Sequence, residues 1–558
     1  MMRLCRFLSH KEGVDLELLQ WIENNISAKK TRLSEHKHFD TVFVGGICVL
    51  MLVIGILYAA LSKTVYFWDS STYWDIGRMM AEKPLNAEFF TSIYKSVCQS
   101  DYNYIAALPV SLWLKVFGVT RISYIASIIT LYLIPVQIIT FLLAKRLCKA
   151  PRMGYLITVL IMPAVLYIVC IGFVDICGVL AGLLCYYLYF AKDDATSSKR
   201  YIYLGLLLTF MMLLRRYFAF FSVSFATVMA VDCILFKKEK KSLVITAVSA
   251  IALLAVFYPF LTNVLLKNYG NLYAGYKYSF TTDLKLITRY FGMAFLILVL
   301  LAAPFAAVRK KDMRGLFALL QALVCGAMFV STQTHGQQHL LLYVPAFTVI
   351  VLVGINAINR RWMLVAIAVV AVLNTVSPMF NRTQPKNIQE IKHISFLPTY
   401  SVKPEVRADI HQILALRRML DKAIPEGSRC GILASSFTVN SSILDNVMPS
   451  LNIKNTRHDR YITGLPEVDS RDYWRLDEIY NIEYLLVPDE AQVHLSPGSQ
   501  TIITQATQSF KNQTDIAEFF THIKDFKASV NGVEYRLYKR DKDISLTAKA
   551  QYELRLFK

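Results

Sequence analysis

Long apolar segments constrain this chain more than any other feature of its sequence. They begin with Thr41–Leu61 and recur as far as Trp362–Val376, in a chain of 558 residues of which 55% are hydrophobic and only 18% are charged. One helical crossing of a lipid bilayer needs about 20 consecutive apolar residues. The sequence therefore predicts a mainly α-helical protein that crosses the membrane repeatedly, and it excludes a soluble enzyme, a disordered chain and a collagen-like chain.

The basic residues indicate how these spans are oriented. If Tyr104–Phe117 lies at the membrane interface instead of crossing it, about eleven spans remain, at residues 41–62, 121–144, 153–171, 174–191, 201–216, 218–236, 242–266, 290–308, 315–331, 339–356 and 362–378. The short loops on one side then hold 17 Lys and Arg residues, and the turns at 171–174 and 332–338 on the other side hold none. Because Lys and Arg favour cytoplasmic loops, the N-terminus is predicted to be cytoplasmic. The net charge of +20 thus sets topology and does not indicate nucleic acid as a partner.

The chain is expected to have three parts. Residues 1–40 form a cytoplasmic amphipathic segment with one helix over Val14–Ala28, and residues 41–379 form the membrane domain, with an outer loop at 63–120. Residues 380–558 have the composition of a small α/β domain outside the cytoplasm. In that domain the segment VRADIHQILALRRMLDKAI has helical apolar spacing, and RCGILAS, IEYLLVPD and EYRLYK are rich in strand-forming residues.

Several polar side chains fall on the predicted outer face of the membrane. Ionisable groups at such a position are expensive and usually mark function. The alternatives are ordinary: the aspartates are good helix N-caps, arginines can extend their charged ends to the interface, and His335 and His339 can be plain loop residues. The candidates are Asp69, Asp101, Tyr102, Asp175, Arg215, Arg216, Tyr217, Gln337, Gln338 and His339.

Carboxylates and arginines on one membrane face suggest a particular chemistry. A carboxylate can deprotonate an attacking hydroxyl, and an arginine can bind a phosphate leaving group with two hydrogen bonds. This pairing suits transfer from a phosphate-linked donor that is anchored in the membrane. The ten cysteines form no CxxC pair, so neither a zinc site nor a disulfide framework is indicated.

The order of the motifs resembles a known family. WDSSTYWDIGRMMAEK, DYNYIAALPVSLWLKVFG and GFVDICGVLAGLLCYYLYF follow one another as in the polyprenyl-phosphate-dependent glycosyltransferases of the C-type fold. The likeness is to the family 39, protein mannosyltransferase-like enzymes, which include the lipid A aminoarabinose transferases, and it covers about residues 41–380. Asp69 matches the first member of the family's Asp-Glu pair, and Ser70 stands in place of the Glu.

The resemblance extends to three further segments. Asp175 matches the second acidic residue of the outer loops, and Arg215 or Arg216, within LLRRYFAFF, matches a basic residue that contacts the lipid phosphate. In HGQQHLLLYVPAF, His339 lies near the position of a family arginine and Pro345 at that of a proline.

The resemblance implies an integral membrane glycosyltransferase, in a bacterial cell membrane, that moves a sugar from a polyprenyl phosphate to an extracytoplasmic glycan, lipid or protein with inversion. By the same resemblance Asp69 and Asp175 are catalytic and would hold a divalent metal (Mg or Mn) if one is used. The remaining roles are donor-phosphate binding by Arg215, Arg216 and Tyr217, and substrate binding by Asp101, Tyr102, Gln337, Gln338 and His339. A transporter or lipid flippase, and a non-catalytic glycan-binding partner subunit, are the alternatives.

Overall fold

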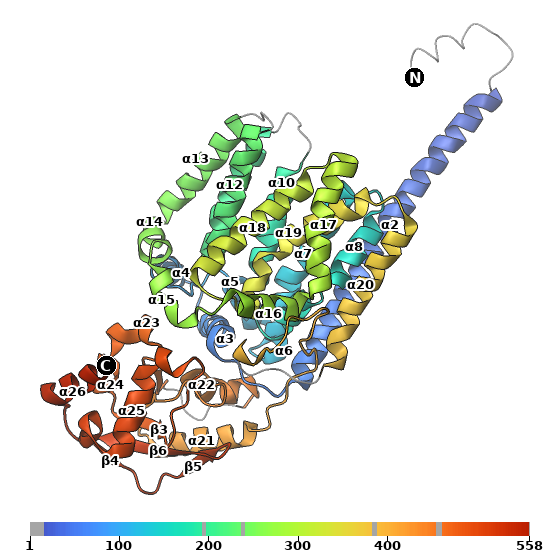
Figure 1. Ribbon diagram of the computed structural model, residues 1–558. Coiled ribbons are helices and arrows are strands. Elements are labelled where there is room, and N and C mark those ends of the chain that lie inside the picture. Colours follow the sequence, from blue (N-terminus) through green and yellow to red (C-terminus); the bar gives the residue numbers. More distant parts are fainter. Residues whose placement is uncertain (1–15, 192–196, 236–239, 382–387, 454–459, 557–558) are drawn as a thin grey trace. The chain divides into compact units, whose positions relative to one another are not determined.

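The computed structural model describes residues 16–191, 197–235, 240–381, 388–453 and 460–556, and most of them are helical (Figure 1). The first element is a single helix, α2 (Leu16–Leu61), which includes an apolar stretch, His38–Leu61, long enough to cross a membrane. The helix expected over Val14–Ala28 is present from Leu16 onward, but its predicted end at Ala28 is wrong, because α2 continues through the basic segment that follows. That segment contains neither glycine nor proline, so nothing in it interrupts a helix. Val14 itself lies outside the described residues.

Every predicted span coincides with helical structure. Among the described residues, six helical segments are long and apolar enough to cross a membrane, and two bent pairs raise the number to eight. The six are His38–Leu61, Arg121–Leu147 (α6, η1 and α7), Arg216–Leu235 (η2, Arg216–Phe218, and α12, Ala219–Leu235), α17 (Met293–Lys310), α18 (Arg314–Thr332) and α20 (Arg361–Phe380). The polytopic helical fold is therefore confirmed. The total of eleven stays a prediction, because α10 (Ile176–Tyr189), α11 (Ser197–Leu214) and α19 (Val344–Ala357) are outside this set.

Prolines break two of the expected spans. The span at 153–171 consists of α8 (Pro151–Ile161) and α9 (Ala164–Cys170), with a 56° bend at Pro163, and the span at 242–266 bends by 89° between α13 (Lys240–Val256) and the segment Tyr258–Leu265, which contains Pro259. Proline removes a backbone donor and collides with the preceding turn, so a continuous helix is not expected there.

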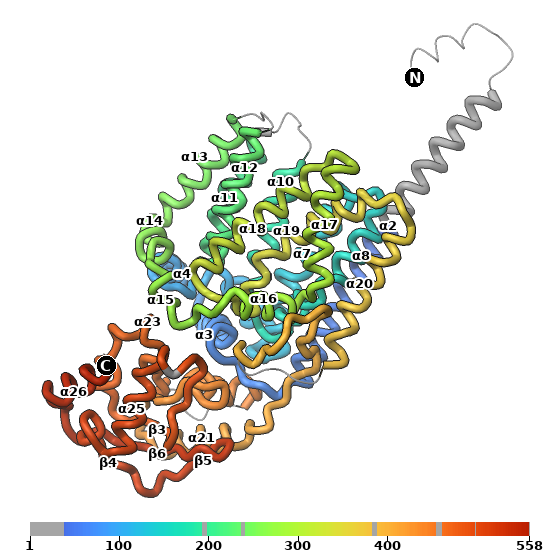
Figure 2. Tube along the Cα trace, in the orientation of Figure 1, coloured from blue at the N-terminus to red at the C-terminus, as the bar shows by residue number. Residues whose placement is uncertain are grey.

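The outer loop after α2 folds into three short helices, α3 (Trp68–Glu82), α4 (Ala87–Gln99) and α5 (Leu108–Phe117). At 10 residues, α5 is only about 15 Å long, about half the thickness of a membrane core. A helix of this length does not by itself cross the membrane, and the interfacial position of Tyr104–Phe117 stays a prediction. Figure 2 follows the chain from these helices through the bundle to the C-terminal part.

The C-terminal part contains a mixed sheet with strand order β2-β1-β3-β6-β4 and with β5 paired to β6. The pairs β1–β2 and β1–β3 are parallel, and β6 is antiparallel to β3, β4 and β5. The strands are β1 (Cys430–Ile432), β2 (Ile462–Gly464), β3 (Tyr484–Pro488), β4 (Phe520–His522), β5 (Ala528–Val530) and β6 (Val533–Arg540). Three of them, together with helix α21 (Ile410–Ala423), confirm the elements expected from sequence.

Helices cover both faces of this sheet, as the alternation of side chains along β3 requires. Tyr484 and Leu486 pack with α21 and α22 (Ser441–Ser450), whereas Leu485 and Val487 pack with α25 (Thr501–Asn512) and α26 (Leu546–Leu556). Two cores therefore fix the C-terminal part, and its loops are held firmly enough to form one wall of a site.

The topology makes a prediction for labelling. Cysteines introduced at the exposed positions Lys149 and Lys241 should react with a membrane-impermeant thiol reagent only after the cytoplasmic side is opened, and one at the exposed Lys524 should react in intact cells. The background is a cysteine-free variant that retains expression. Labelling of positions 241 and 524 from the same side would contradict the orientation.

Candidate functional site

A cavity of about 2180 Å³ lies where the outer loop, several helix ends and the C-terminal domain meet. Its size exceeds that of an ordinary small-molecule pocket, about 300–1,000 Å³. Nine of the ten candidate residues predicted from the sequence line it. The tenth, Asp175, is buried behind Arg215. The nine are Asp69, Asp101, Tyr102, Arg215, Arg216, Tyr217, Gln337, Gln338 and His339.

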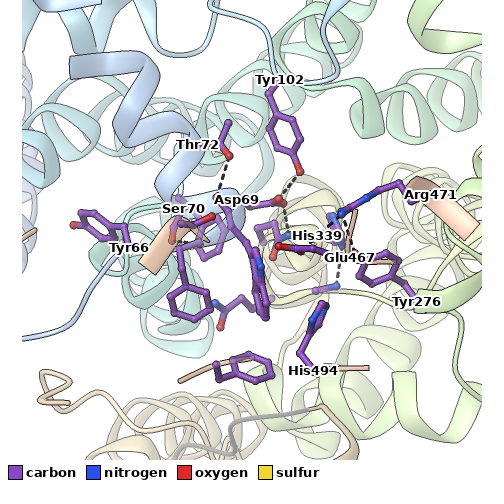
Figure 3. A pocket seen from close by; sticks show the side chains of 18 of the residues that line it. Tyr66, Asp69, Ser70, Thr72, Tyr102, Tyr276, His339, Glu467, Arg471 and His494 are labelled. Atoms are coloured by element: carbon purple, nitrogen blue, oxygen red, sulfur yellow. Dashed lines mark hydrogen bonds and ion pairs between the residues drawn. The ribbon is translucent and has the colours of Figure 1, made fainter. Parts of the chain in front are cut away.

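Asp69, in the first turn of α3, presents its carboxylate to this cavity. The side chain is 25% exposed. It accepts hydrogen bonds from the Tyr102 hydroxyl and, at 2.9 Å, from the Gln338 amide, and Arg215 Nη2 lies 3.3 Å away (Figure 3). Burial raises the pKa of Asp69. Arg215 and the Tyr102 hydrogen bond lower it by a larger amount, so the pKa of Asp69 lies below its ordinary value. Asp69 is therefore ionised at neutral pH.

Arg215 joins Asp69 to the second carboxylate. Its Nε lies 3.0 Å from Asp175 Oδ1, and Tyr217 donates to the same oxygen at 2.5 Å. Asp175 is 1% exposed and Arg215 5%. Among the described residues, Arg215 Nη1 and Asp175 Oδ2 have no hydrogen-bond partner. One guanidinium thus bridges two carboxylates and keeps one donor nitrogen unused.

Close helix packing sets the position of Arg215 and Arg216. Both lie where α11 ends and η2 begins, and the following Phe218 packs against Gly178 of α10. A Cβ atom at Gly178 would lie 2.0 Å from the Phe218 ring. The absence of a side chain at this position allows the two arginines to approach the N-terminus of α10.

A second ionic cluster lies around Arg216. Its Nη1 is 2.7 Å from Asp101 Oδ2, and Nη2 contacts the Tyr273 hydroxyl. Lys267 Nζ is 3.1 Å from the other oxygen of Asp101, and the Tyr269 ring lies 4.6 Å below the Arg216 guanidinium. The cluster is more open to the cavity than Arg215, because the Arg216 and Asp101 side chains are 15% and 28% exposed.

The short helix η5 (Gln337–Leu342) supplies a further wall. Gln338 binds Asp69, as described, and Gln337 accepts a hydrogen bond from Tyr290 at 2.5 Å. His339 Nδ1 accepts the Gly336 N–H at 2.8 Å, and its ring packs against Tyr217. The sequence motif HGQQH therefore turns its last three side chains, Gln337, Gln338 and His339, into the cavity.

The alternative roles of helix N-cap, interfacial arginine and plain loop residue do not describe the following side chains. Asp175 is at the N-cap of α10 but makes no capping hydrogen bond, and Phe67 rather than Asp69 is the N-cap of α3. Asp101 follows α4 and precedes no helix directly. Arg215 is 4% exposed, so it does not extend to the interface. His335 is not a plain loop residue either, because its ring is buried between Asp283 and Tyr343.

The C-terminal domain contributes a wall that the sequence did not predict. Phe437, Glu467, Arg471 and His494 all line the cavity, and Figure 3 shows the last three on one side of it, facing the region of Asp69 and Tyr102. They come from three separate chain segments, around Phe437, at Glu467–Arg471 and around His494, so no single local motif marks them. The one sequence signal was the unusual density of aromatic residues, which is equally typical of membrane interfaces.

Trp68, next to Asp69, has an unusual backbone. Its φ is +48°, a region that costs a bulky residue about 1–3 kcal/mol and that clusters at functional sites. The ring lies 4.3 Å from His494 and 5.0 Å from Phe437, measured between ring centroids. Contact with the C-terminal domain therefore stabilises the start of α3 and, with it, the direction of the Asp69 side chain.

Two titratable groups in this wall have shifted pKa values. Burial raises the pKa of Glu467 to about 7, against the opposing effect of Arg471. Burial also lowers the pKa of His494 to about 4, and its Nδ1–H donates to the Ser435 carbonyl at 2.9 Å. His494 is therefore neutral at pH 7, and Glu467 exchanges its proton near that pH.

The two carboxylates do not fit a divalent-metal site. No group of three or more His, Cys, Asp and Glu suited to a metal occurs within the part of the chain that the structure describes. Arg215 already places a positive charge between Asp69 and Asp175, at 3.3 and 3.0 Å. A cation between the same oxygens would be repelled by the guanidinium.

Comparison with solved structures identifies the fold. ArnT from Cupriavidus metallidurans bound to undecaprenyl phosphate is similar with a TM-score of 0.54 and 11% identity, over 90% of this chain and 99% of that chain. ArnT in the apo state gives 0.55 and 12%, over 90% and 98%. The archaeal oligosaccharyltransferase AglB from Archaeoglobus fulgidus, in complex with an inhibitory peptide and a dolichol-phosphate, gives 0.44 and 13%, over 91% and 75%. No protein-family profile and no curated protein matches the chain.

The chain therefore has the fold of ArnT, and the C-type glycosyltransferase fold implied by the sequence motifs is confirmed. It is a polytopic membrane protein with its cavity between the helix ends and the C-terminal domain.

The pKa of Glu467 predicts how stability depends on pH. The Glu467 carboxyl has a pKa near 4.3 when the protein is unfolded and about 7 when it is folded. It therefore keeps its proton to a higher pH in the folded state. Stability therefore falls as pH rises between these values, by on the order of 3 kcal/mol. Glu467→Gln should remove this loss, so its apparent unfolding temperature should exceed that of the wild type increasingly from pH 5 to about 7 and by a nearly constant amount above that pH.

Glu534→Gln is the matched control, because the Glu534 side chain is 64% exposed in the same domain. Its unfolding temperature should follow the wild type at every pH. Thermal unfolding in detergent measures all three proteins, and a Glu467→Gln curve parallel to that of the wild type would contradict the assignment.

Proposed function

We propose that this protein is a membrane glycosyltransferase that moves a sugar from a polyprenyl phosphate to a hydroxyl of an extracytoplasmic acceptor. The observation that carries the proposal is an ionised carboxylate, Asp69, that faces a large cavity beside two arginines. A base for the acceptor and cations for a phosphate are the two groups that this reaction requires.

Asp69 is the proposed general base. The acceptor hydroxyl oxygen attacks the anomeric carbon while its proton passes to the Asp69 carboxylate, and the bond from that carbon to the phosphate oxygen breaks. A single displacement of this kind inverts the configuration. Asp69 suits the role better than Asp175, because its side chain is 25% exposed and lines the cavity, whereas Asp175 is 1% exposed.

The arginines are the proposed partners of the leaving group. Breaking the bond turns a phosphodiester with one negative charge into a phosphate monoester with up to two, so added charge must be stabilised. Arg216 is partly exposed beside Lys267, and Arg215 has the unused Nη1. Asp175 and Tyr217 act as positioning residues, because Asp175 holds Arg215 by its Nε and Tyr217 donates a hydrogen bond to the same Asp175 oxygen.

Arg215 also takes the place of a metal in this proposal. Its charge holds Asp69 ionised and lies next to the site of the leaving phosphate, and no step requires a divalent ion. Of the remaining candidates, Asp101 is paired with Arg216. Tyr102, Gln337, Gln338 and His339 line the cavity around Asp69 and are the proposed donor head-group ligands. The ArnT structure that shares the fold is bound to undecaprenyl phosphate, which supports a lipid-phosphate donor here.

Asp69→Asn should lower the rate of sugar transfer about 100- to 10,000-fold, which is the usual contribution of a general base. The amide keeps the shape of the side chain but cannot accept the proton. Transfer from a labelled polyprenyl-phosphate sugar is measured with purified protein, together with donor affinity and thermal stability, and both of these should change little.

Asp75→Asn is the matched control. Asp75 lies on the same helix with a similarly exposed side chain, 22%, but is paired with Arg78. Transfer by Asp69→Asn within threefold of the wild type would refute the base. Donor binding without transfer by the wild type, for every acceptor offered, would favour the alternative of a non-catalytic partner, and donor movement across the bilayer would favour a flippase.

Arg216→Ala should weaken donor binding strongly. Removing one partner of a desolvated ion pair costs about 2–5 kcal/mol, much of it from the charge that is left behind. Binding of polyprenyl phosphate is titrated at low salt, with Arg78→Ala as a control that removes an arginine away from the cavity. Equal affinity of Arg216→Ala and Arg78→Ala would exclude Arg216 as a phosphate ligand.

A further inference from the structure

Three aromatic rings form a platform on the cavity wall, and no step of the proposed reaction uses it. Trp68 lies 4.3 Å from His494 and 5.0 Å from Phe437, and Phe437 and His494 are 6.2 Å apart, all between ring centroids. We call these three residues the aromatic platform. Trp68 and Phe437 are only half-buried, so ring surface remains open to the cavity.

Polar side chains border this platform. The Tyr276 ring lies 6.2 Å from His494, and its hydroxyl accepts a hydrogen bond from Arg471 Nη1 at 3.1 Å. Arg471 Nη2 is 3.8 Å from the Glu467 carboxylate. The three rings are inclined to one another, at 78° for Trp68 and Phe437, 44° for Trp68 and His494, and 89° for Phe437 and His494, so the apolar surface consists of the exposed faces of single rings. A carboxylate, a guanidinium and a phenol lie beside these faces and provide both hydrogen-bond donors and acceptors at their edge.

The platform is tied to the base by the chain itself. Trp68 and Asp69 are consecutive, and the φ of +48° at Trp68 is a conformation that bulky residues rarely adopt. Backbone outliers of this kind persist where the surroundings hold them and are concentrated at functional sites. Trp68 and Asp69 both line the cavity, so a molecule that rests on the Trp68 ring lies in the same cavity as the proposed base.

This combination of surfaces favours a carbohydrate. A pyranose has an apolar C–H face that packs on an aromatic ring and a rim of hydroxyls that both donate and accept hydrogen bonds. An acyl chain has no polar groups that could form hydrogen bonds with Glu467 and Arg471. A phosphate would be repelled by Glu467 when it is ionised, and the arginines assigned to phosphate lie in a different part of the chain.

We infer that the aromatic platform, together with Glu467 and Arg471, is the acceptor subsite and that it binds a pyranose ring of a glycan acceptor. This inference rests on the proposed function, because it assigns the acceptor of that same reaction. The C-terminal domain then selects the acceptor, while the helices of the membrane domain bind the donor. The acceptor hydroxyl is delivered to Asp69 from the side opposite the lipid phosphate.

The test uses full-length protein in detergent and four probes, the methyl pyranosides of glucose, mannose, galactose and N-acetylglucosamine. Saturation-transfer NMR should detect binding of at least one, and Phe437→Ala should weaken it at least tenfold, whereas Trp68→Phe, which keeps a ring, should weaken it less. Phe396→Ala is the control, because Phe396 is 68% exposed and does not line the cavity. If Phe437→Ala does not fold, Phe437→Leu keeps the volume and removes the ring face, with the same expectation.

Binding of polyprenyl phosphate to the same variants separates the two proposals. It should be unchanged in Phe437→Ala. Binding of none of the four pyranosides, equal binding by Phe437→Ala and the wild type, or preferential binding of a short serine-containing peptide would overturn the subsite, even where donor binding and transfer persist. Pyranoside binding that depends on Phe437 in a protein without transfer activity would support the subsite and count against the proposed function.

Discussion

The geometry of the site depends on the sharing of Arg215 between two carboxylates. An isolated charge at this depth would be severely destabilising, and each of the three groups is tolerable only because the others are present. Asp175, fully buried, holds the guanidinium from behind, and Asp69 meets it from the cavity. The same contact keeps Asp69 ionised, so the structural requirement and the proposed chemistry coincide.

The division of labour in the cavity follows from how the chain is folded. The helix ends supply charged groups at fixed positions, because helices α10, α11 and α12 pack closely there. The C-terminal domain supplies aromatic and hydrogen-bonding groups on loops held by its two cores. Under the proposed function the donor side lies on packed helices and the acceptor side on loops, where a binding surface changes without disturbing the scaffold.

The sequence predicted the helices well because bilayer crossing requires length and apolarity, which are local properties. It missed the breaks at Pro163 and Pro259, because the spans were predicted from the length of each apolar run and the helix-breaking proline inside the run was not considered. Asp69, Arg215 and Asp175 were accessible to sequence analysis, because charges near apolar segments are rare. Their arrangement was not, since a pairing of residues 40 and 146 positions apart is decided only by tertiary packing.

The wall formed by Glu467, Phe437 and His494 could not be predicted for a different reason. In a soluble α/β domain such residues are common, and nothing in their spacing distinguishes a cavity wall from an ordinary surface. The pKa of Glu467 depends on burial under loops distant in sequence, which no local pattern encodes. The proposed role of this domain therefore depends on its contact with the outer loop and not on a sequence motif within the domain.

In the proposed function, Arg215 and Arg216 bind the donor phosphate while Asp69 faces the anomeric carbon. An experimental structure of the protein with bound polyprenyl phosphate tests it most directly. We expect a phosphate oxygen within hydrogen-bond distance of Arg215 Nη1 and another near Arg216, with the Asp69–Arg215–Asp175 contacts preserved. A phosphate bound elsewhere in the cavity, with both arginines still occupied only by their aspartates, would contradict it.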